Sequence, residues 1–177
     1  MAQSKLKIAL LRGVNISGTN KVGMKELCKS LEKVGYKNVR SYINSGNLIF
    51  ESEKDADSIE KTISDTIVNK FEVKTPVLVL TFDLLDKIYR ENPFNDSRYQ
   101  PNLVHIIFIK DTTKLKLFKD KIQTEDLYQI GTHAIYLYTP DGYHKTKINN
   151  LFWEKRLNTL ATARNLNTVT KLSQMLN

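Results

Sequence analysis

The chain of 177 residues carries 27 Lys and Arg against 19 Asp and Glu, for a net charge of +8, and 41% of its residues are hydrophobic. This composition excludes a disordered chain, and the single Cys28 excludes an internal disulfide framework. No apolar run reaches the roughly 18 residues of a membrane span, and the apolar stretch before Arg12 is too short for a signal peptide. We therefore expect a cytoplasmic folded protein without membrane contact.

The first half of the sequence predicts a β-α-β-β-α-β order. Apolar periodicity predicts strands at 6–11, 39–43, 48–50 and 77–80 and helices at about 24–34 and 55–71. The first helix is expected to end at Gly35 and to bury four side chains, Met24, Leu27, Leu31 and Val34. The segment Asn44-Ser45-Gly46-Asn47 predicts a hairpin turn with a positive φ at Gly46 or at a neighbouring asparagine.

The second half repeats this order after a short helix expected at 83–89. The predicted strands lie at 104–109, 127–130 and 134–138, the helices at 114–122 and 149–157, and an extended piece near 160–163 precedes a last helix. We therefore predict an α+β fold of two ferredoxin-like β-α-β-β-α(-β) halves, residues 1–80 and 102–177. A helical connector over residues 81–101 is expected to join them into one compact unit.

Three predicted strands are apolar on both faces, namely Ile8–Leu11, Val77–Leu80 and Ile106–Ile109. This pattern predicts antiparallel sheets that are covered on both faces. RNA-recognition modules of the same topology leave one sheet face open, and a signature strand supplies aromatic residues that stack on bases. That signature is absent from the sequence, so RNA stacking on an open sheet face is disfavoured.

The loop from Arg12 to Gly23 links the first strand to the first helix. Gly13 and Gly18 have the spacing of a phosphate loop, but Thr19-Asn20 stands where such loops need Lys followed by Ser or Thr, which excludes a nucleoside-triphosphate loop. A weaker anion site is compatible with the loop and would use Arg12, Asn15 and Lys21, near a helix N-terminus. The alternative is a loop whose glycines only allow tight packing.

Lysines recur every four residues from the end of this loop through the first helix, at Lys21, Lys25, Lys29, Lys33 and Lys37. On a helix Lys25, Lys29 and Lys33 lie nearly opposite the apolar stripe. The pattern has two interpretations, a solvated face that keeps the protein soluble or a surface that attracts phosphate backbones.

A second polar segment runs from Thr162 to Leu172 and contains Arg164, Asn165 and Lys171. Asparagine and threonine are ordinary capping residues at a helix start, so a purely structural interpretation is available. Arginine beside such donors also binds carboxylates and phosphates.

The charge is unevenly spread along the chain. Residues 1–40 carry a net charge of +7, residues 41–143 carry −4, and residues 144–177 carry +5. We predict that Arg12, Lys21, Arg164 and Lys171 contribute to one electropositive cleft near two helix N-termini. The full set of candidate ligand-binding residues is Arg12, Asn15, Lys21, Ser45, Asn47, Arg164, Asn165 and Lys171.

Residues with catalytic chemistry form no recognisable motif. His105, His133 and His144 lack a sequence-local partner for a triad, and Cys28 is expected to be a small buried apolar residue. The metal-binding motifs of metalloenzymes are absent as well. The sequence therefore predicts no metal site and no cofactor, and it assigns no catalytic residue and no oligomeric state.

The resemblance to a known family rests on four stretches, ALLRGVNISGTNKVGMKEL, VRSYINSGNLIF, LYTPDGYHKTKI and TARNLNTVTKL. Together they resemble the bacterial family called domain of unknown function 1697 over nearly the whole chain. The resemblance implies a compact α+β protein with ferredoxin-like halves, from a family without an assigned activity.

The chain departs from that family at Ser17, at Leu166, where Trp is usual, and at His144-Lys145-Thr146. A family Trp that stacks on a base or sugar has no substitute in this chain. Leu166 can instead replace a Trp that anchors the core.

Three classes of function fit these patterns. The first is a binding module for nucleic acid or for an anionic small molecule such as a nucleotide or phosphorylated metabolite, built from the two basic ends. The second is an enzyme that acts on a phosphorylated or carboxylated small molecule, and the third is a structural or interaction protein. Charge distribution favours the first class.

Overall fold

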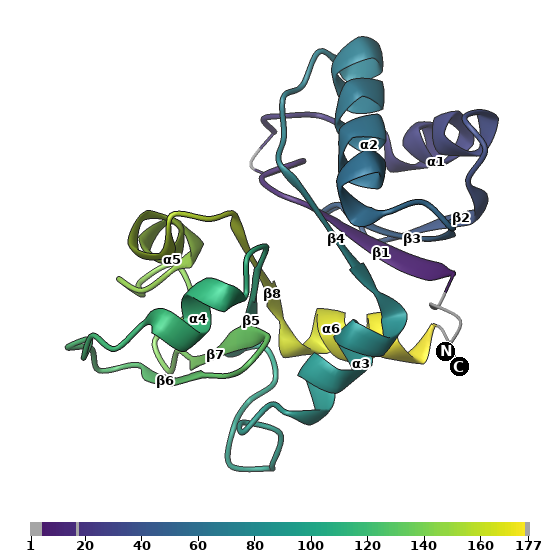
Figure 1. Ribbon diagram of the computed structural model, residues 1–177. Helices are drawn as coiled ribbons and strands as arrows, with labels where there is room; N and C mark the ends of the chain where they lie inside the picture. The colour runs from purple at the N-terminus through teal and green to yellow at the C-terminus, as the bar shows by residue number, and fades with distance from the viewer. Residues whose placement is uncertain (1–4, 17, 176–177) are drawn as a thin grey trace. The chain divides into compact units, whose positions relative to one another are not determined.

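The structure is a computed structural model that describes residues 5–16 and 18–175. The family departure at Ser17 lies outside these residues. The chain divides between Leu84 and Leu85 into two compact units, which are described separately below (Figure 1).

The first unit contains a four-stranded antiparallel sheet with two helices on one face (Figure 1). Its elements are β1 (Leu6–Leu11), α1 (Met24–Lys33), β2 (Lys37–Tyr42), β3 (Asn47–Glu51), α2 (Ala56–Phe71) and β4 (Val77–Thr81). The strands lie in the order β2-β3-β1-β4, so β1 is central and pairs with β3 and β4. This order and connectivity are those of a ferredoxin-like fold.

The second unit has the same strand order, β6-β7-β5-β8. The elements from Phe82 onward are α3 (Phe82–Arg90), β5 (Val104–Ile109), α4 (Thr113–Leu117), β6 (Leu127–Ile130), β7 (Ala134–Tyr138), α5 (Asn150–Leu157), β8 (Ala161–Asn165) and α6 (Leu166–Gln174). The predicted α+β class with two ferredoxin-like sheets is therefore confirmed. A nine-residue helix follows the last strand of each sheet directly, α3 after β4 and α6 after β8, and the boundary between the units falls within α3.

The strand register explains why the central strands are apolar on both sides. Ala9 pairs with Leu48 and Val79, and this face packs against α1 and α2 in the core of the first unit. The neighbouring Ile8 and Leu10 point to the other face and are also fully buried. In the second unit Ile107 and Ile135 pair on the face that packs against α4 and α5.

Helix α2 begins where the sequence predicts, because the side chain of Asp55 accepts a hydrogen bond from the backbone N–H of Ser58 at 2.8 Å. The interior side of this helix carries Ile59, Ile63 and Ile67, all fully buried. That spacing of four residues is the apolar stripe of an amphipathic helix.

Two sequence expectations are wrong in detail. Val34 is 47% exposed rather than buried, because α1 ends at Lys33 and Gly35 follows with φ +99°, so Val34 leaves the apolar stripe. The helix expected over 114–122 ends at Leu117. Phe118 there adopts an extended backbone and packs edge-on against Trp153, with ring centroids 5.5 Å apart, so tertiary packing overrides the local helical pattern.

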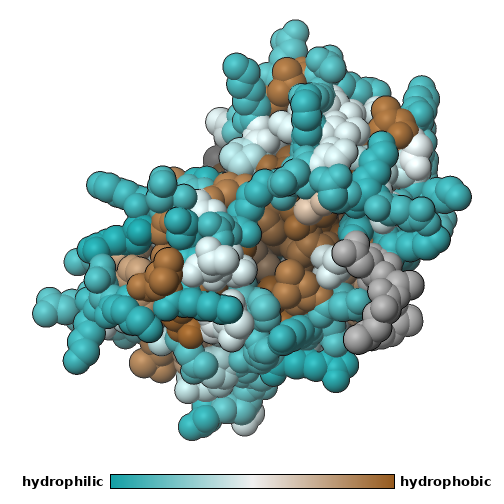
Figure 2. Space-filling model, viewed as in Figure 1, coloured by the Kyte–Doolittle hydropathy of each residue, from teal (hydrophilic) through white to brown (hydrophobic). Residues whose placement is uncertain are grey.

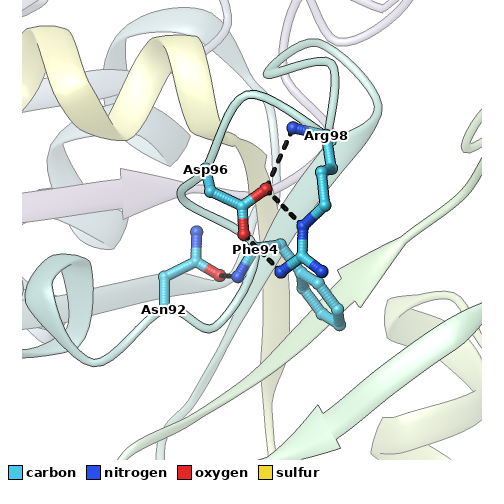
Figure 3. A network of polar contacts seen from close by, with 4 residues as sticks. All are labelled: Asn92, Phe94, Asp96 and Arg98. Atoms are coloured by element: carbon cyan, nitrogen blue, oxygen red, sulfur yellow. Dashed lines mark hydrogen bonds and ion pairs between the residues drawn. The ribbon is translucent and has the colours of Figure 1, made fainter.

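The segment between α3 and β5 is held by its own polar side chains (Figure 3). Arg98 donates two hydrogen bonds from Nε and Nη2 to the carboxylate of Asp96, at 2.9 and 2.6 Å. The side chain of Asn92 accepts a hydrogen bond from the backbone N–H of Phe94 at 3.1 Å. These hydrogen bonds to Arg98 lower the pKa of Asp96 to about 2, so the carboxylate stays ionised throughout the physiological range.

None of the helices formed by residues 5–16 and 18–175 combines the length and the apolar character required to cross a membrane.

Candidate functional site

Three backbone segments meet at one end of the first sheet. They are the loop that follows β1, the turn between β2 and β3, and the start of β4. The N–H of Leu11 donates to the carbonyl of Gly46 at 2.8 Å, and the N–H of Arg12 donates to the carbonyl of Pro76 at 3.0 Å. The hydroxyl of Thr75 also donates to the carbonyl of Arg12. We call this region the loop end of the first unit: residues 12–16 and 18–23, residues 43–47, and Thr75 with Pro76.

Asn15 holds two of these segments together. Its Nδ2 donates to the carbonyls of Val22 at 2.9 Å and of Asn44 at 2.8 Å, and its Oδ1 accepts from the N–H of Val22 at 2.8 Å. Both amide hydrogens are therefore engaged within the protein. A ligand that used them would have to displace one of these bonds, so the observed role of Asn15 is to fix the loop.

A second asparagine closes the loop on itself. Nδ2 of Asn20 donates to the carbonyl of Gly13 at 2.9 Å, and the carbonyl of Asn20 accepts from the N–H of Asn15 at 3.0 Å. Arg12 and Lys21 are the chain neighbours of the two residues joined by the first of these bonds. This hydrogen bond therefore brings the backbone at Arg12 near the backbone at Lys21, although the two residues are nine positions apart in the sequence.

The hairpin turn between β2 and β3 is confirmed. Gly46 has φ +81°, in the left-handed region that favours glycine. A Cβ atom at this position would lie 2.6 Å from Cγ2 of Val14 and 2.7 Å from Cβ of Leu11, so the loop packs directly against the turn. The positive φ and this close approach both require glycine.

Two candidate ligand-binding residues, Ser45 and Asn47, lie in the same turn. Asn47 is fully buried, and its Nδ2 donates to the carbonyl of Tyr42 and to Oγ of Ser45, both at 3.1 Å. Ser45 is exposed. Asn47 thus stabilises the turn, and ligand binding by either residue stays a prediction.

The lysine row of the first unit is exposed throughout, at Lys21, Lys25, Lys29, Lys33 and Lys37. Across the described part of the chain none of these five side chains makes an ion pair, whereas Lys61 pairs with Asp65 and Lys87 with Glu91. Helix α1 begins after Gly23, which provides no side-chain cap for the first-turn N–H groups. Positive charge therefore accumulates along α1 and at its start.

Arg164, Asn165 and Lys171 belong to the second unit, at the junction of β8 and α6. Nη1 of Arg164 donates to Oγ1 of Thr162 at 3.0 Å and to the carbonyl of Ala163 at 2.9 Å. Burial lowers the pKa of Arg164 to about 10, which still leaves the guanidinium charged at neutral pH. Oδ1 of Asn165 accepts from the N–H of Thr168 at 2.9 Å and so caps α6, while Lys171 is exposed in the last turn of that helix.

Arg12 and Lys21 lie in one compact unit, and Arg164 and Lys171 lie in the other. Their predicted contribution to a single cleft stays a prediction. Leu166, which occupies the position of the usual family Trp, is 6% exposed and begins α6, as a core anchor would.

Two cavities lie away from the predicted site residues. One, of about 380 Å³, is in the first unit and includes Tyr36, Lys37 and Lys54 in its lining. The other, of about 530 Å³, is in the second unit and includes Asp126, Lys145 and Lys147. Both linings mix acidic and basic side chains, a feature that the spacing of the sequence does not reveal.

Groups with reactive chemistry are dispersed. His105 is buried and stacks on Tyr143 with ring centroids 4.4 Å apart, and burial lowers its pKa. Cys28 is a half-buried free thiol packed against the core of the first unit, and burial raises its pKa. In the part of the chain that the structure describes, no group of three or more His, Cys, Asp or Glu side chains is arranged to hold a metal ion.

The topology and the two polar loops define a tandem ferredoxin-like α+β protein. The family described as "Protein of unknown function (DUF1697)" matches residues 5–136, and the chain belongs to that family. The predicted family is confirmed, and the matched residues contain the first two of the four sequence stretches.

Comparison with solved structures gives the same fold. The conserved bacterial protein SP0830 from Streptococcus pneumoniae superposes with a TM-score of 0.74 at 23% sequence identity, over 97% of this chain and 98% of that one. At this identity the likeness establishes the fold alone. No curated protein matches the chain.

Proposed function

We propose that the protein is a binding module for an anionic ligand, and that the loop end of the first unit is a contact surface for it. The observation that carries this proposal is the clamped loop between β1 and α1. The hydrogen bond from Asn20 to Gly13 brings the backbone at Arg12 near the backbone at Lys21, and the loop leads into a helix whose first turn has no side-chain cap.

The loop between β1 and α1 is longer than the fold requires. The equivalent connection in the second unit, from β5 to α4, takes only residues 110–112, whereas the first unit uses residues 12–23. The additional residues are held by the side chains of Asn15 and Asn20. Cations beside a helix N-terminus, on a loop held by side-chain hydrogen bonds, form a favourable environment for a phosphate or carboxylate.

The charge distribution supports the same conclusion. Residues 1–40 carry a net charge of +7, and the lysines nearest to the loop have no acidic partner among the described residues. Holding like charges together is unfavourable, and a bound anion relieves that repulsion. The basic segment of the second unit, with Arg164 and Lys171, is proposed as a further contribution to anion binding.

The test is calorimetric titration with inorganic phosphate and pyrophosphate. R12Q/K21Q should weaken binding by at least tenfold, since each charged hydrogen bond is worth about 1.5–3 kcal/mol. R164A should weaken binding roughly tenfold to a hundredfold on the same basis, with the fold intact by circular dichroism. The matched control is K61Q/K87Q, which removes two lysines that are already paired with acids.

Two results would contradict the proposal. One is a parent protein that binds neither anion at low ionic strength. The other is equal binding by the parent and by R12Q/K21Q. In either case the candidate ligand-binding residues have a structural role only, which for Asn15 and Asn47 is to hold the loop and the turn by hydrogen bonds.

A further inference from the structure

The lysine face of α1 concentrates positive charge, and its side chains form no ion pair within the described part of the chain. We define it as Lys25, Lys29 and Lys33, flanked by Lys21 and Lys37. All five side chains are exposed, and over α1 and α2, at the top of the view, Figure 2 shows hydrophilic side chains projecting among white and brown ones. Residues four apart lie on one side of a helix, so the three central lysines form a row.

The two acidic residues on the same helix, Glu26 and Glu32, offset only part of the charge of this row. Glu26 is engaged by Lys70, with Oε1 and Nζ 3.0 Å apart, which leaves Glu32 as the acid nearest to the lysines along the helix. Repulsion between lysines at i and i+4 costs a few tenths of a kcal/mol per pair in an isolated helix. The arrangement is thus slightly unfavourable for the protein alone and favourable beside a polyanion.

The opposite side of α1 fixes how the row is presented. Met24, Leu27 and Leu31 are buried in the core of the first unit, so the helix is rigidly seated and its apolar residues are already used. A helix that binds a membrane surface needs a free apolar face to insert between lipids. The face that α1 presents is cationic, which favours a hydrophilic polyanion over a lipid surface.

The spacing of the row fits a phosphate backbone. From Lys25 to Lys33 the helix rises about 12 Å at 1.5 Å per residue. One strand of a nucleic acid duplex carries a phosphate about every 3.4 Å along its axis, so the row extends over about three phosphates.

The burial of the aromatic side chains favours duplex over single-stranded nucleic acid as the ligand. Single-strand binders stack bases on accessible aromatic side chains. Every Phe, Tyr and Trp in the described part of this chain is buried or half-buried, and none is exposed. Base stacking is thereby disfavoured, and contact with the phosphates of a duplex is favoured.

We propose that the lysine face of α1 binds the phosphate backbone of duplex nucleic acid without sequence preference. This inference rests on the proposed anion-binding function but assigns the contact to Lys25, Lys29 and Lys33, whereas the proposed function is tested at Arg12 and Lys21. Backbone contacts of this kind position a protein on the duplex and carry no base information.

The experiment measures fluorescence anisotropy of a labelled 20-base-pair DNA duplex with the full chain. For three phosphate contacts the logarithm of affinity should fall with the logarithm of salt with a slope of about −2.7, or roughly 40-fold between 50 and 200 mM salt. K25Q/K29Q/K33Q should reduce affinity at least tenfold and flatten the slope, because Gln retains helix propensity while removing charge. K61Q/K87Q/K116Q, which removes the same net charge elsewhere, should bind nearly as the parent does.

Several outcomes would overturn the inference. They are no duplex binding by the parent, equal loss in both triple variants, tighter binding to the single strand than to the duplex, and tighter lysine-dependent binding to vesicles that contain anionic lipid. Phosphate titration of R12Q/K21Q decides the proposed function separately. A parent that binds phosphate but not the duplex refutes only this inference.

Discussion

The two units share one topology but connect the first strand to the first helix in different ways. In the second unit residues 110–112 suffice, and Asp111 serves this short connection by accepting a hydrogen bond from the N–H of Thr113 at 3.1 Å. In the first unit the equivalent connection has residues 12–23 and is held by hydrogen bonds from the side chains of Asn15 and Asn20. Since the fold can be closed with three residues, the longer loop is an addition to the scaffold, as expected of a loop that carries function.

The cores of the two units also differ. The helices of the first unit, α1 and α2, have 10 and 16 residues, whereas α4 and α5 have 5 and 8. The shorter helices of the second unit are offset by larger side chains, because the fully buried Trp153 packs against Phe118, Phe152 and Tyr128. Large aromatic residues bury 150–250 Å² each, so fewer helical turns fill the same space.

A third difference lies at one equivalent position of the central strands. Lys7 pairs with Thr81 across β1 and β4, and His105 pairs with Asn165 across β5 and β8. Both side chains are buried, at 6% and 9% exposure. Burial lowers the pKa of His105 below its ordinary value, so the second unit should lose stability in mild acid.

The largest effect is expected at the turn that supports the long loop. Gly46→Val should destabilise the protein by about 2–5 kcal/mol, because a β-branched residue is strained at φ +81° and its Cβ overlaps Val14 and Leu11. Gly35→Val is the matched control. Gly35 also has a positive φ, but a Cβ there would meet nothing within 4 Å, so the cost should be about 1–2 kcal/mol.

Urea denaturation measures both variants. If Gly46→Val and Gly35→Val lose the same stability, the loop does not pack tightly on the turn, and the contrast between the two units is weaker than the structure indicates.

Asn15→Ala should have the next largest effect, a loss of about 2–3 kcal/mol, since three hydrogen bonds disappear, two to Val22 within the loop and one to Asn44 in the turn. Asn38→Ala serves as the control, because Asn38 has a similar φ of +53° and makes one exposed side-chain bond, to Glu51. The difference between the losses of unfolding free energy in Asn15→Ala and Asn38→Ala gives the contribution of the Asn15 hydrogen bonds. A difference below about 0.5 kcal/mol would show that the loop is ordered without Asn15.

The smallest effect is expected from mild acid acting on His105. Burial lowers its pKa below the ordinary 6.5, so the unfolded chain binds the proton more readily than the folded protein does. The stability that the neutral ring provides is fully present above pH 6.5 and is lost as the pH falls towards the lowered pKa. Unfolding free energies at pH 7.5 and 5.5 should show a decrease in the parent and a smaller decrease in His105→Phe, which keeps a ring beside Tyr143. Identical pH dependence in parent and variant would contradict this assignment.

Much of the local structure follows from the sequence alone. The bounds predicted for β1, β5, β6 and β7 are those observed, because a short apolar run bounded by polar or turn residues is a local property of each strand. The order of elements and the positive φ in the turn at Gly46 are also local, since glycine is the residue that reaches this conformation without strain. The exposed row of lysines follows in the same way from the helical period.

Tertiary structure decided what the polar residues of the loops do. The types and spacing of Asn15 and Asn47 suit a ligand site, but their amides are engaged with Val22, Asn44 and Tyr42. The length of α4 was decided in the same way, by packing of Phe118 on Trp153. A local pattern specifies periodicity and backbone preference, whereas hydrogen-bond partners distant in sequence exist only once the strands have paired, because pairing is what brings β1, β3 and β4 to a common end.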